Sequence, residues 1–450
     1  EGGAGVRPHK NSINNYCYPE NPEAGIDLFL EKLVQETEKE HEDILEQADE
    51  TDAMFGELYS WYLRNPEYRS RVQKLVQSAF AGKPEDIISQ SVAKALYGEV
   101  SPYSATRLER FAACAFAHFL QYGMKLTERV EYEFKPMDMG NVMHEALESF
   151  AEEVRKRGMK WTELTEQERN EIADRCLDNI VADYGNTVLK SSARNEYMIE
   201  RTRRILRRTV WALQKQLEQG EFQPEGFEVT FGGGRIDRVD IMEDQNKVYV
   251  KVIDYKTGNT SFDLVYLYHG LQLQLMIYLD GALRVEQKKY PDKEIIPAGV
   301  FYYNIKDPMI QEKIDADVEA VSAGLMKELK MNGLAQADPE LVYRMDSSLG
   351  SIPVAFNKDG SFRKNSSVAD RTQFAVLGRY VRTKIEKIRS SILEGDAEVS
   401  PYELGKKNAC TYCPYMTVCG FDRRLSGYEF RRLKNFSDEE LWKAFDREAE

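Results

Sequence analysis

Several features that mark membrane, secreted or nucleic-acid-coating proteins are missing from this 450-residue sequence. No apolar run approaches the roughly 18 residues that a membrane span needs. No secretory signal is visible near the start of the chain. The formal net charge of −14 argues against a protein that coats nucleic acid through a general excess of positive charge. These features leave room for an enzyme with one local basic groove.

Cysteine is scarce, with six residues in the chain. These are too few for a disulfide framework in a chain of this length. Three of them fall in CTYCPYMTVC, residues 410–419, and such close spacing is typical of metal binding rather than of disulfides. We therefore predict a reducing, cytoplasmic setting. The sequence also lacks the G-x-x-x-x-G-K-[ST] motif, so it shows no recognisable ATP-binding loop.

The periodicity of apolar residues predicts helices first, then a small sheet, then more helices. Helical patterns cover residues 24–95 and continue from about 104 to 219. A strand–turn–strand pattern follows at 226–258, then a helix at 271–285 and another strand within 294–307. With 42% hydrophobic residues the chain can bury a core. This order predicts an α/β fold with a small mixed sheet flanked by many helices.

The stretch VYVKVIDYKTGNT, residues 248–260, reads as a buried strand that ends in charged residues. Residues two apart on a strand share a face, so Asp254 and Lys256 point to one side and Tyr255 to the other. If the strand pairs with GRIDRVD as a hairpin, Asp237 and Asp254 converge. Two adjacent carboxylates favour a divalent cation such as Mg²⁺ or Mn²⁺ between them, and a nearby lysine can stabilise developing charge. This combination suits phosphodiester hydrolysis, whereas D-x-K alone is more often an ion-paired strand end.

Two candidate positions have alternatives. Asp240 competes with Asp237, because DRVD offers both and strand alternation points them to opposite faces. His144 lies on the amphipathic stretch GNVMHEALESF, where a lone histidine is more often structural. An imidazole can nevertheless complete a metal shell.

In this order, GNVMHEALESF, GRIDRVD, VIDYKTG and LQLQLMIYLD resemble the motifs of the RecB-type nucleases, a branch of the PD-(D/E)XK superfamily. The resemblance implies a restriction-endonuclease-like core and a Mg²⁺- or Mn²⁺-dependent deoxyribonuclease. It also implies that Lys256 is the catalytic lysine and that the family's Q-x-x-x-Y element falls on Gln274 and Tyr278. Gln272 is the alternative glutamine. The implied metal ligands are His144, Asp237, Asp254 and the carbonyl group of Tyr255.

The cysteine motif C-x₂-C-x₅-C supplies three ligands and needs a fourth from elsewhere. No histidine lies beyond His269, and Cys114 in ERFAACAFAHF is the best candidate. One cysteine before the nuclease motifs and three after them resembles the AddB-type iron–sulfur nucleases. The resemblance implies that a [4Fe–4S] cluster joins the two ends of the domain through Cys114, Cys410, Cys413 and Cys419. Cys17 and Cys176 are predicted to be ordinary thiols, and a zinc-stabilised interaction module is the alternative.

The resemblance covers roughly residues 100–435 and predicts three parts of the chain. Residues 1–99 would be the helical end of a helicase-like part, 100–435 the nuclease domain, and 436–450 a tail. The implied partners are DNA and an AddA-like helicase–nuclease subunit, and the implied process is double-strand break repair by recombination. A related stand-alone [4Fe–4S] exonuclease and a catalytically silent DNA-binding scaffold are alternatives.

Two basic segments are candidates for DNA contact. In ERTRRILRRTVWALQKQLEQG, residues 200–220, we predict that Arg203 and Arg207 contact phosphates, with a solvated helix face as the alternative. The second segment is FDRRLSGYEFRRLKNF, residues 421–436, whose aromatic side chains can stack on exposed bases.

Overall fold

The computed structural model describes most of the chain. Of the predicted N-terminal region, residues 1–49 lie outside the described part, and so does Cys17. The described residues are 50–79, 87–98, 103–127, 136–183, 192–232, 234–310, 317–425 and 427–449.

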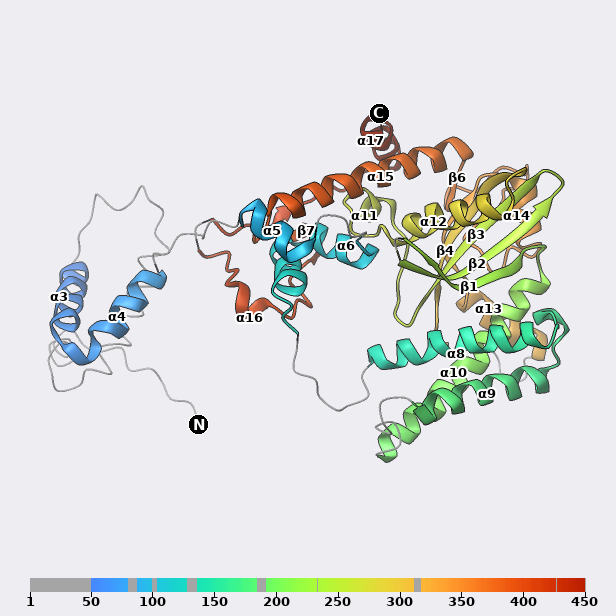
Figure 1. Ribbon diagram of the computed structural model, residues 1–450, viewed down its shortest axis with the longest axis horizontal. Helices are drawn as coiled ribbons and strands as arrows, with labels where there is room; N and C mark the ends of the chain where they lie inside the picture. The colour runs from blue at the N-terminus through green and yellow to red at the C-terminus, as the bar shows by residue number, and fades with distance from the viewer. Residues whose placement is uncertain are drawn as a thin grey trace.

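The predicted mixed sheet is present, with six strands in the order β1-β2-β3-β4-β5-β6 (Figure 1). Strands β1, β2 and β3 form an antiparallel meander, whereas β3 and β4 run parallel. Strand β5 is antiparallel to β4 and parallel to β6. The strands are β1 (Gln223–Phe231), β2 (Gly234–Asp244), β3 (Lys247–Lys256), β4 (Glu294–Asn304), β5 (Asn332–Gln336) and β6 (Val368–Ala369).

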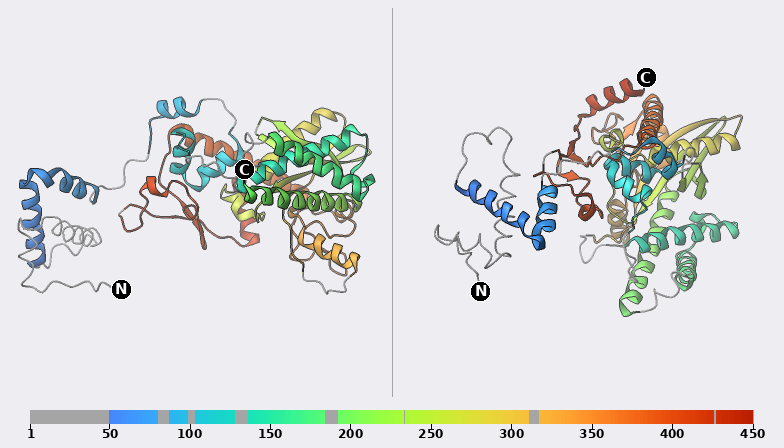
Figure 2. Two further views of the ribbon diagram at one scale, coloured as in Figure 1. Left: turned by 90° about the horizontal axis from the view of Figure 1, so that it is seen from below. Right: turned by 60° about the vertical axis from the view of Figure 1, so that its left-hand side comes forward.

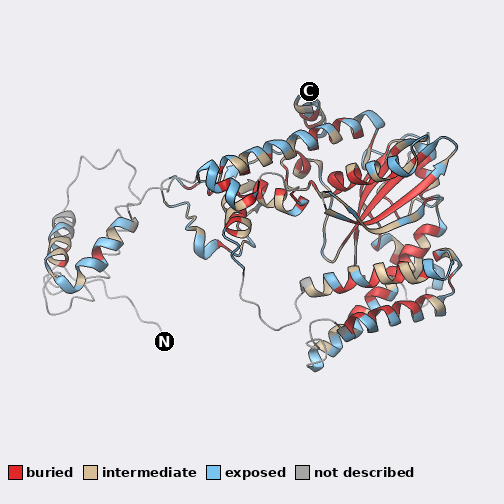
Figure 3. Ribbon diagram, viewed as in Figure 1, coloured by how far each residue is buried: buried red, intermediate tan, exposed pale blue. Residues whose placement is uncertain are grey.

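Helices cover both faces of this sheet, and each face has its own hydrophobic core. One face packs against α8 (Pro136–Lys156), α9 (Glu166–Asp183) and α10 (Ala193–Glu218). The other packs against α12 (Gln274–Lys289) and α15 (Arg371–Glu394). Figures 1 and 2 show the two groups on opposite sides, and Figure 3 shows buried residues along the strands and on the helix faces turned toward them.

Shorter elements surround this core. A second sheet has three short strands in the order β8-β7-β9. Its strands are β7 (Tyr402–Leu404), β8 (Lys407–Asn408) and β9 (Arg431–Arg432). The further helices are α5 (Gln90–Tyr97), α6 (Ala105–Ala113), α7 (Ala115–His118), the π-helix η3 (Phe119–Gly123), the 3₁₀ helix η4 (Trp161–Glu163), α11 (Leu264–Tyr268), α13 (Val318–Glu328), α14 (Pro339–Met345), α16 (Met416–Cys419) and α17 (Asp438–Ala449).

The packing differs from the predicted part boundaries at both ends. Tyr97 of α5 and Phe445 of α17 lie in the same core as α12 and α15, so α5 and α17 belong to the sheet-centred unit. The predicted C-terminal tail is thus a packed amphipathic helix, because Leu441, Ala444 and Phe445 share one buried face. By contrast, α3 (Glu50–Arg64) and α4 (Pro66–Ala79) share a small core of their own. None of the helices within the described residues is long and apolar enough to cross a membrane.

Side chains along β3 alternate between the two faces of the sheet, which decides the face to which Asp254 and Lys256 point. Val252 belongs to the core under α12, whereas Ile253 and Tyr255 belong to the core on the opposite face. Asp254 and Lys256 therefore follow Val252 on the α12 face. Polar side chains are thus placed where a central strand leaves the core, at the start of α12.

Candidate active site

The predicted hairpin is formed, and it brings the two aspartates together. Arg238 of β2 pairs with Ile253 of β3, so Asp237 and Asp254 are the next residues along the two strands. Asp237 is 8% exposed and Asp254 is 1% exposed. Asp237 Oδ2 accepts a hydrogen bond from the backbone N–H of Tyr255 at 2.7 Å, which fixes its carboxylate against β3.

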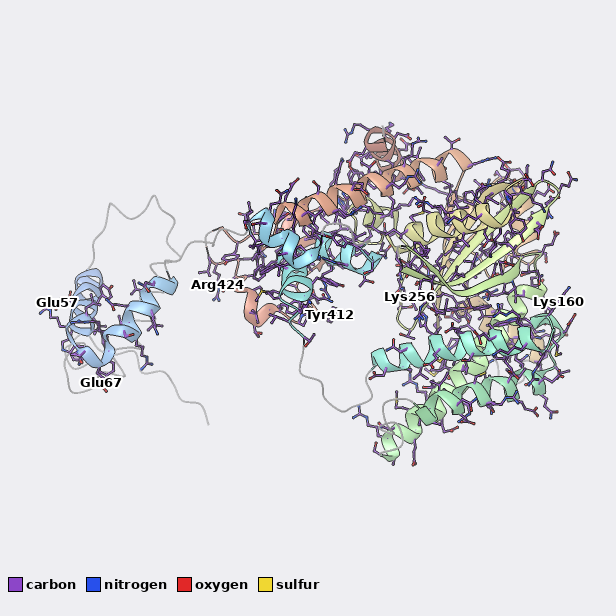
Figure 4. All side chains as sticks on the ribbon, in the orientation of Figure 1. Glu57, Glu67, Lys160, Lys256, Tyr412 and Arg424 are labelled. Carbon is purple, nitrogen blue, oxygen red and sulfur yellow. The ribbon has the colours of Figure 1, made fainter. Side chains whose placement is uncertain are left out.

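Lys256 lies beside these carboxylates, at the end of the sheet that faces α6 (Figure 4). Its Nζ is 2.6 Å from Asp254 Oδ2 and forms an ion pair with it. Asp254 Oδ2 is buried, and its contact with Lys256 does not have the geometry of a hydrogen bond. Burial, together with the charge of Asp237, raises the pKa of Asp254 to about 7, against the opposing effect of Lys256. Two buried carboxylates with one lysine leave unneutralised negative charge, which favours a bound cation.

The next group is His144 of α8, whose Nδ1 is 3.4 Å from Asp237 Oδ2 and 3.7 Å from Glu228 Oε1. Among the described residues, His144, Glu228 and Asp237 form a set whose ligand atoms all lie within 4.8 Å of one another. Burial alone would lower the pKa of His144, but hydrogen bonds to Asp237 and Glu228 raise it to about 10. Together the imidazole and the two carboxylates could hold a metal ion.

The sequence analysis missed Glu228. Phe227 pairs with Arg238 and Val229 with Ile236, so Glu228 lies directly across from Asp237 in the β1–β2 pair. Pairing the residues of the two strands outward from the turn at Gly232 would have predicted that Glu228 lies opposite Asp237. Glu228 is one of the non-glycine residues with positive φ, at +49°, and Arg235 Nε lies 2.5 Å from its Oε2.

The two open alternatives are resolved by geometry. Asp240 is fully buried on the opposite face, where it pairs with Arg238 at 2.5 Å and Lys251 at 2.9 Å. Of the two aspartates, Asp237 is therefore the one that lies beside Asp254. Gln272 binds the loop backbone at Ser261 O and Asp263 N, so it is not directed at Lys256.

The glutamine that reaches the site is Gln274, the first residue of α12. Lys256 Nζ donates to Gln274 Oε1 at 2.7 Å, and Gln274 Nε2 donates to Tyr278 OH at 2.9 Å. The four-residue spacing places Gln274 and Tyr278 on one side of the helix. The predicted Q-x-x-x-Y pair thus forms a hydrogen-bonded chain that ends at the lysine.

The four cysteines of the predicted cluster line one cavity. Cys114 ends α6 and precedes α7, whereas the other three lie on the 410–419 segment. Tyr415 OH donates to Leu126 O at 3.0 Å, which joins the same two parts of the chain. The other lining residues are apolar or aromatic: Phe116, Ala117, Val399, Pro401, Ala409, Tyr415, Met416 and Phe421.

The spacing of these cysteines bears on which metal fits. A tetrahedral zinc with Zn–S bonds of about 2.3 Å needs sulfur atoms about 3.8 Å apart. In the described part of the chain, no three cysteine Sγ atoms lie within 4.8 Å of one another. Burial, added to by the charges of the other three cysteines, raises the pKa of Cys410 to about 12, so its thiol stays protonated at neutral pH unless a metal ion binds it. Cys176 belongs to α9 and is buried in the core that α9 shares with α8, apart from this set.

The predicted DNA-contacting arginines have partners within the chain. Arg203 pairs with Asp178 at 2.7 Å, and Arg207 pairs with Asp174. Both acidic residues belong to α9, so these pairs join α10 to α9. This arrangement favours a structural role, and DNA contact by either arginine stays a prediction. In the second basic segment, Arg423 stacks on Phe430 with its guanidinium carbon 5.7 Å from the ring centre.

The two aspartates and the lysine at the end of the β2–β3 hairpin are consistent with the protein family whose model the chain matches. Residues 102–420 match the family model of the PD-(D/E)XK nuclease superfamily, and the chain belongs to that superfamily. The predicted fold class is thereby confirmed.

The chain is also similar to individual proteins, all of which carry the same name. The chain is 41% identical over 425 residues to the B-type subunit of the ATP-dependent helicase/deoxyribonuclease of Lachnoclostridium phytofermentans. It is 33% identical to the same protein of Thermoanaerobacter sp. strain X514 over 425 residues and of Clostridium acetobutylicum over 423 residues. Each alignment covers 89% of this chain but only 36%, 37% and 36% of the respective relatives. The chain thus spans little more than a third of the length of these relatives.

Proposed function

We propose that this chain is the deoxyribonuclease part of an AddB-like helicase–nuclease subunit and that it hydrolyses phosphodiester bonds with a divalent cation. The observation that carries the proposal is the convergence of Asp237, Asp254 and Lys256 at the end of the β2–β3 hairpin. His144 and Glu228 complete the ring of ligand groups around Asp237.

The donor set fits Mg²⁺ or Mn²⁺, because it consists mainly of carboxylate and carbonyl oxygens with one imidazole. The residues that would hold the ion are His144, Asp237, Asp254, the carbonyl of Tyr255 and, added by the structure, Glu228. When bound, such an ion neutralises phosphate charge and lowers the pKa of a coordinated water.

The side chains of this chain then have distinct tasks. Asp254 holds the Nζ of Lys256 from one side at 2.6 Å, and Gln274 holds the same Nζ from the other side at 2.7 Å. An ammonium fixed by two partners can orient a water or steady the developing charge on phosphorus-bound oxygen. Tyr278 in turn holds Gln274, so the lysine is pre-positioned rather than mobile.

A [4Fe–4S] cluster held by Cys114, Cys410, Cys413 and Cys419 would join α6 and α7 to the 410–419 segment. The cavity that all four cysteines line, with otherwise apolar and aromatic walls, supports a cluster with four cysteine ligands. Because the ligands are 296 positions apart (410 − 114), the cluster would restrict the unfolded chain strongly.

The partners follow from the names of the relatives, which are B-type subunits of ATP-dependent helicase/deoxyribonucleases. These names support a second subunit and DNA as partners. From the motif resemblance we further propose that the second subunit is AddA-like, that the compartment is the cytoplasm and that the process is double-strand break repair by recombination.

The test replaces the lysine and keeps the fold. Lys256→Met should reduce Mg²⁺-dependent cleavage of linear DNA by about 10²–10³-fold while DNA binding stays within about twofold. The matched control is Lys247→Met at the exposed start of the same strand, which should cleave like the parent. Cleavage by Lys256→Met at the parent rate, or cleavage by the parent in excess chelator, would overturn the proposal.

A further inference from the structure

Helix α12, which carries Gln274 and Tyr278, begins without a capping residue of its own. Leu273 stands at the N-cap position in a helical conformation, and its side chain cannot accept a hydrogen bond. The first backbone N–H groups of a helix need acceptors. Other helices in this chain supply their own, such as α14, whose Asp338 accepts from Glu340 N and Leu341 N.

The acceptor for α12 comes from another helix. Glu109 Oε1 accepts from Leu273 N at 2.7 Å and from Gln274 N at 2.9 Å, although Glu109 lies on α6. A carboxylate at a helix N-terminus is also favoured by the helix dipole. Burial raises the pKa of Glu109 to about 7 against these two hydrogen bonds, so the chain keeps a carboxyl here at a cost in free energy.

The residue that Glu109 holds is the one that holds the catalytic lysine. The backbone N–H of Gln274 is bound by Glu109, and the side-chain oxygen of Gln274 is bound by Lys256 Nζ. One residue therefore connects the carboxylate on α6 to the ammonium on β3. Displacing it by about 1 Å would move the lysine out of its productive position, an effect that can cost about 10²-fold in rate.

The other end of α6 reaches the cysteine cavity. Cys114 ends the helix, five residues after Glu109, and its thiol lines the cavity with the other three cysteines. Arg431 additionally donates to Ala112 O in the last turn of α6. Helix α6 contacts both α7 and α12.

We propose that Glu109 is a positioning residue that couples the cysteine cluster to the active-site lysine, acting through α6, the first turn of α12 and Gln274. This inference rests on the proposed nuclease function and adds a residue, and a path, that neither the family motifs nor the cation site contains. Loss of the cluster would then lower activity by releasing α6 and, with it, the start of α12.

The first experiment measures how firmly the start of α12 is held when no metal is bound at the nuclease site. Amide hydrogen exchange of the segment 271–280 is compared in the iron-loaded, magnesium-free parent, Glu109→Ala, Glu109→Gln and the control Asp338→Ala. Exchange in this segment should be at least about tenfold faster in Glu109→Ala and close to the parent in Glu109→Gln, which keeps an acceptor oxygen. Asp338→Ala, which removes a cap of the same kind from α14, should leave segment 271–280 unchanged.

Cluster loss supplies the second arm. Cys114→Ser should speed exchange in segment 271–280 but leave α9, which packs in the other core, close to the parent. Faster exchange across both segments indicates general unfolding and contradicts a specific path. Unchanged exchange at 271–280 in both Glu109→Ala and Cys114→Ser overturns the inference, whether or not the parent cleaves DNA.

Kinetics separate positioning from simple stabilisation. Glu109→Ala should lower kcat by about 10–100-fold with KM for DNA within about twofold and full iron content, and Glu109→Gln should recover to within about threefold of the parent. In a Gln274→Ala background, Glu109→Ala should add less than about threefold, because both residues act through one contact. The inference is contradicted if the losses of kcat from Glu109→Ala and Gln274→Ala are additive. It is also contradicted if the parent is active and Glu109→Ala has the same kcat as the parent. An inactive parent contradicts the proposed function instead.

Discussion

Glu228 and Asp237 lie directly opposite each other in the β1–β2 pair, and both approach the same His144 Nδ1, at 3.7 Å and 3.4 Å. If these groups bind one cation, removing a charge from either should weaken it. We expect Glu228→Gln to raise the Kd for Mn²⁺ by about 10–100-fold, as measured by calorimetry or by the Mn²⁺ resonance signal.

Glu225→Gln on the same strand is the matched control, because Glu225 pairs with Lys289 outside the site. Its Kd for Mn²⁺ should equal that of the parent. An unchanged Kd in Glu228→Gln would remove Glu228 from the cation site and leave it as the ion-pair partner of Arg235.

The cysteine cavity predicts the metal content. Protein purified without oxygen should be brown and contain about four irons per chain. Cys114→Ser and Cys413→Ser should each lose most of this iron, because both side chains line the cavity. Cys176→Ser, in the core that α9 shares with α8, should keep it. Stoichiometric zinc in the parent, or full iron in Cys114→Ser, would refute the cluster assignment.

The carboxyl of Glu109 predicts a pH dependence of stability in the iron-loaded, magnesium-free protein. Its folded pKa, about 7, is above the ordinary value of 4.5 because of burial. The stability it contributes is therefore fully present below pH 4.5 and is lost as the pH rises to about 7. Relative to the parent, Glu109→Gln should gain on the order of 1–3 kcal/mol in free energy of unfolding over this window.

Denaturant unfolding at intervals between pH 4.5 and 8 measures this difference, with the exposed Glu340→Gln on α14 as control. The control should follow the parent at every pH. A constant offset between Glu109→Gln and the parent across the window would show that this carboxyl does not change its ionisation there.

The arginines of α10 are tested by separating stability from DNA binding. Because Arg203 and Arg207 pair with Asp178 and Asp174, we expect Arg203→Gln with Arg207→Gln to lower the free energy of unfolding by roughly 1 kcal/mol. A salt dependence of single-strand DNA binding equal to that of the exposed control Arg201→Gln would leave both arginines with a structural role alone. A slope that falls by about one per arginine would establish phosphate contact.

Much of the site was predictable because strand alternation and motif spacing act over short distances. Asp254 and Lys256 share a face by geometry alone, and a hairpin brings Asp237 beside them. The resemblance implied Gln274, but local periodicity alone could not prefer it over Gln272, since the choice depends on where α12 begins. That start is set by Glu109, 165 residues earlier. Contacts of this range are set by tertiary packing, which local patterns do not encode.

The same limit explains the other differences. The ion pairs of the α10 arginines could not be predicted because their partners lie on α9. The packing of α17 could not be predicted because the core that it joins is built from residues far away in sequence. Glu228 was missed since the strand pairing around a glycine turn had to be counted in register.

Cleavage by an Asp254 variant decides whether the carboxylates on the β2–β3 hairpin form a divalent-cation nuclease site. The parent, Asp254→Ala and the turn control Asp292→Ala are compared on end-labelled linear DNA with Mg²⁺, and DNA binding is measured in parallel. We predict that Asp254→Ala loses cleavage by at least about 10³-fold while its fold and DNA affinity stay near those of the parent, and that Asp292→Ala cleaves normally. Cleavage by Asp254→Ala at the parent rate would contradict the account.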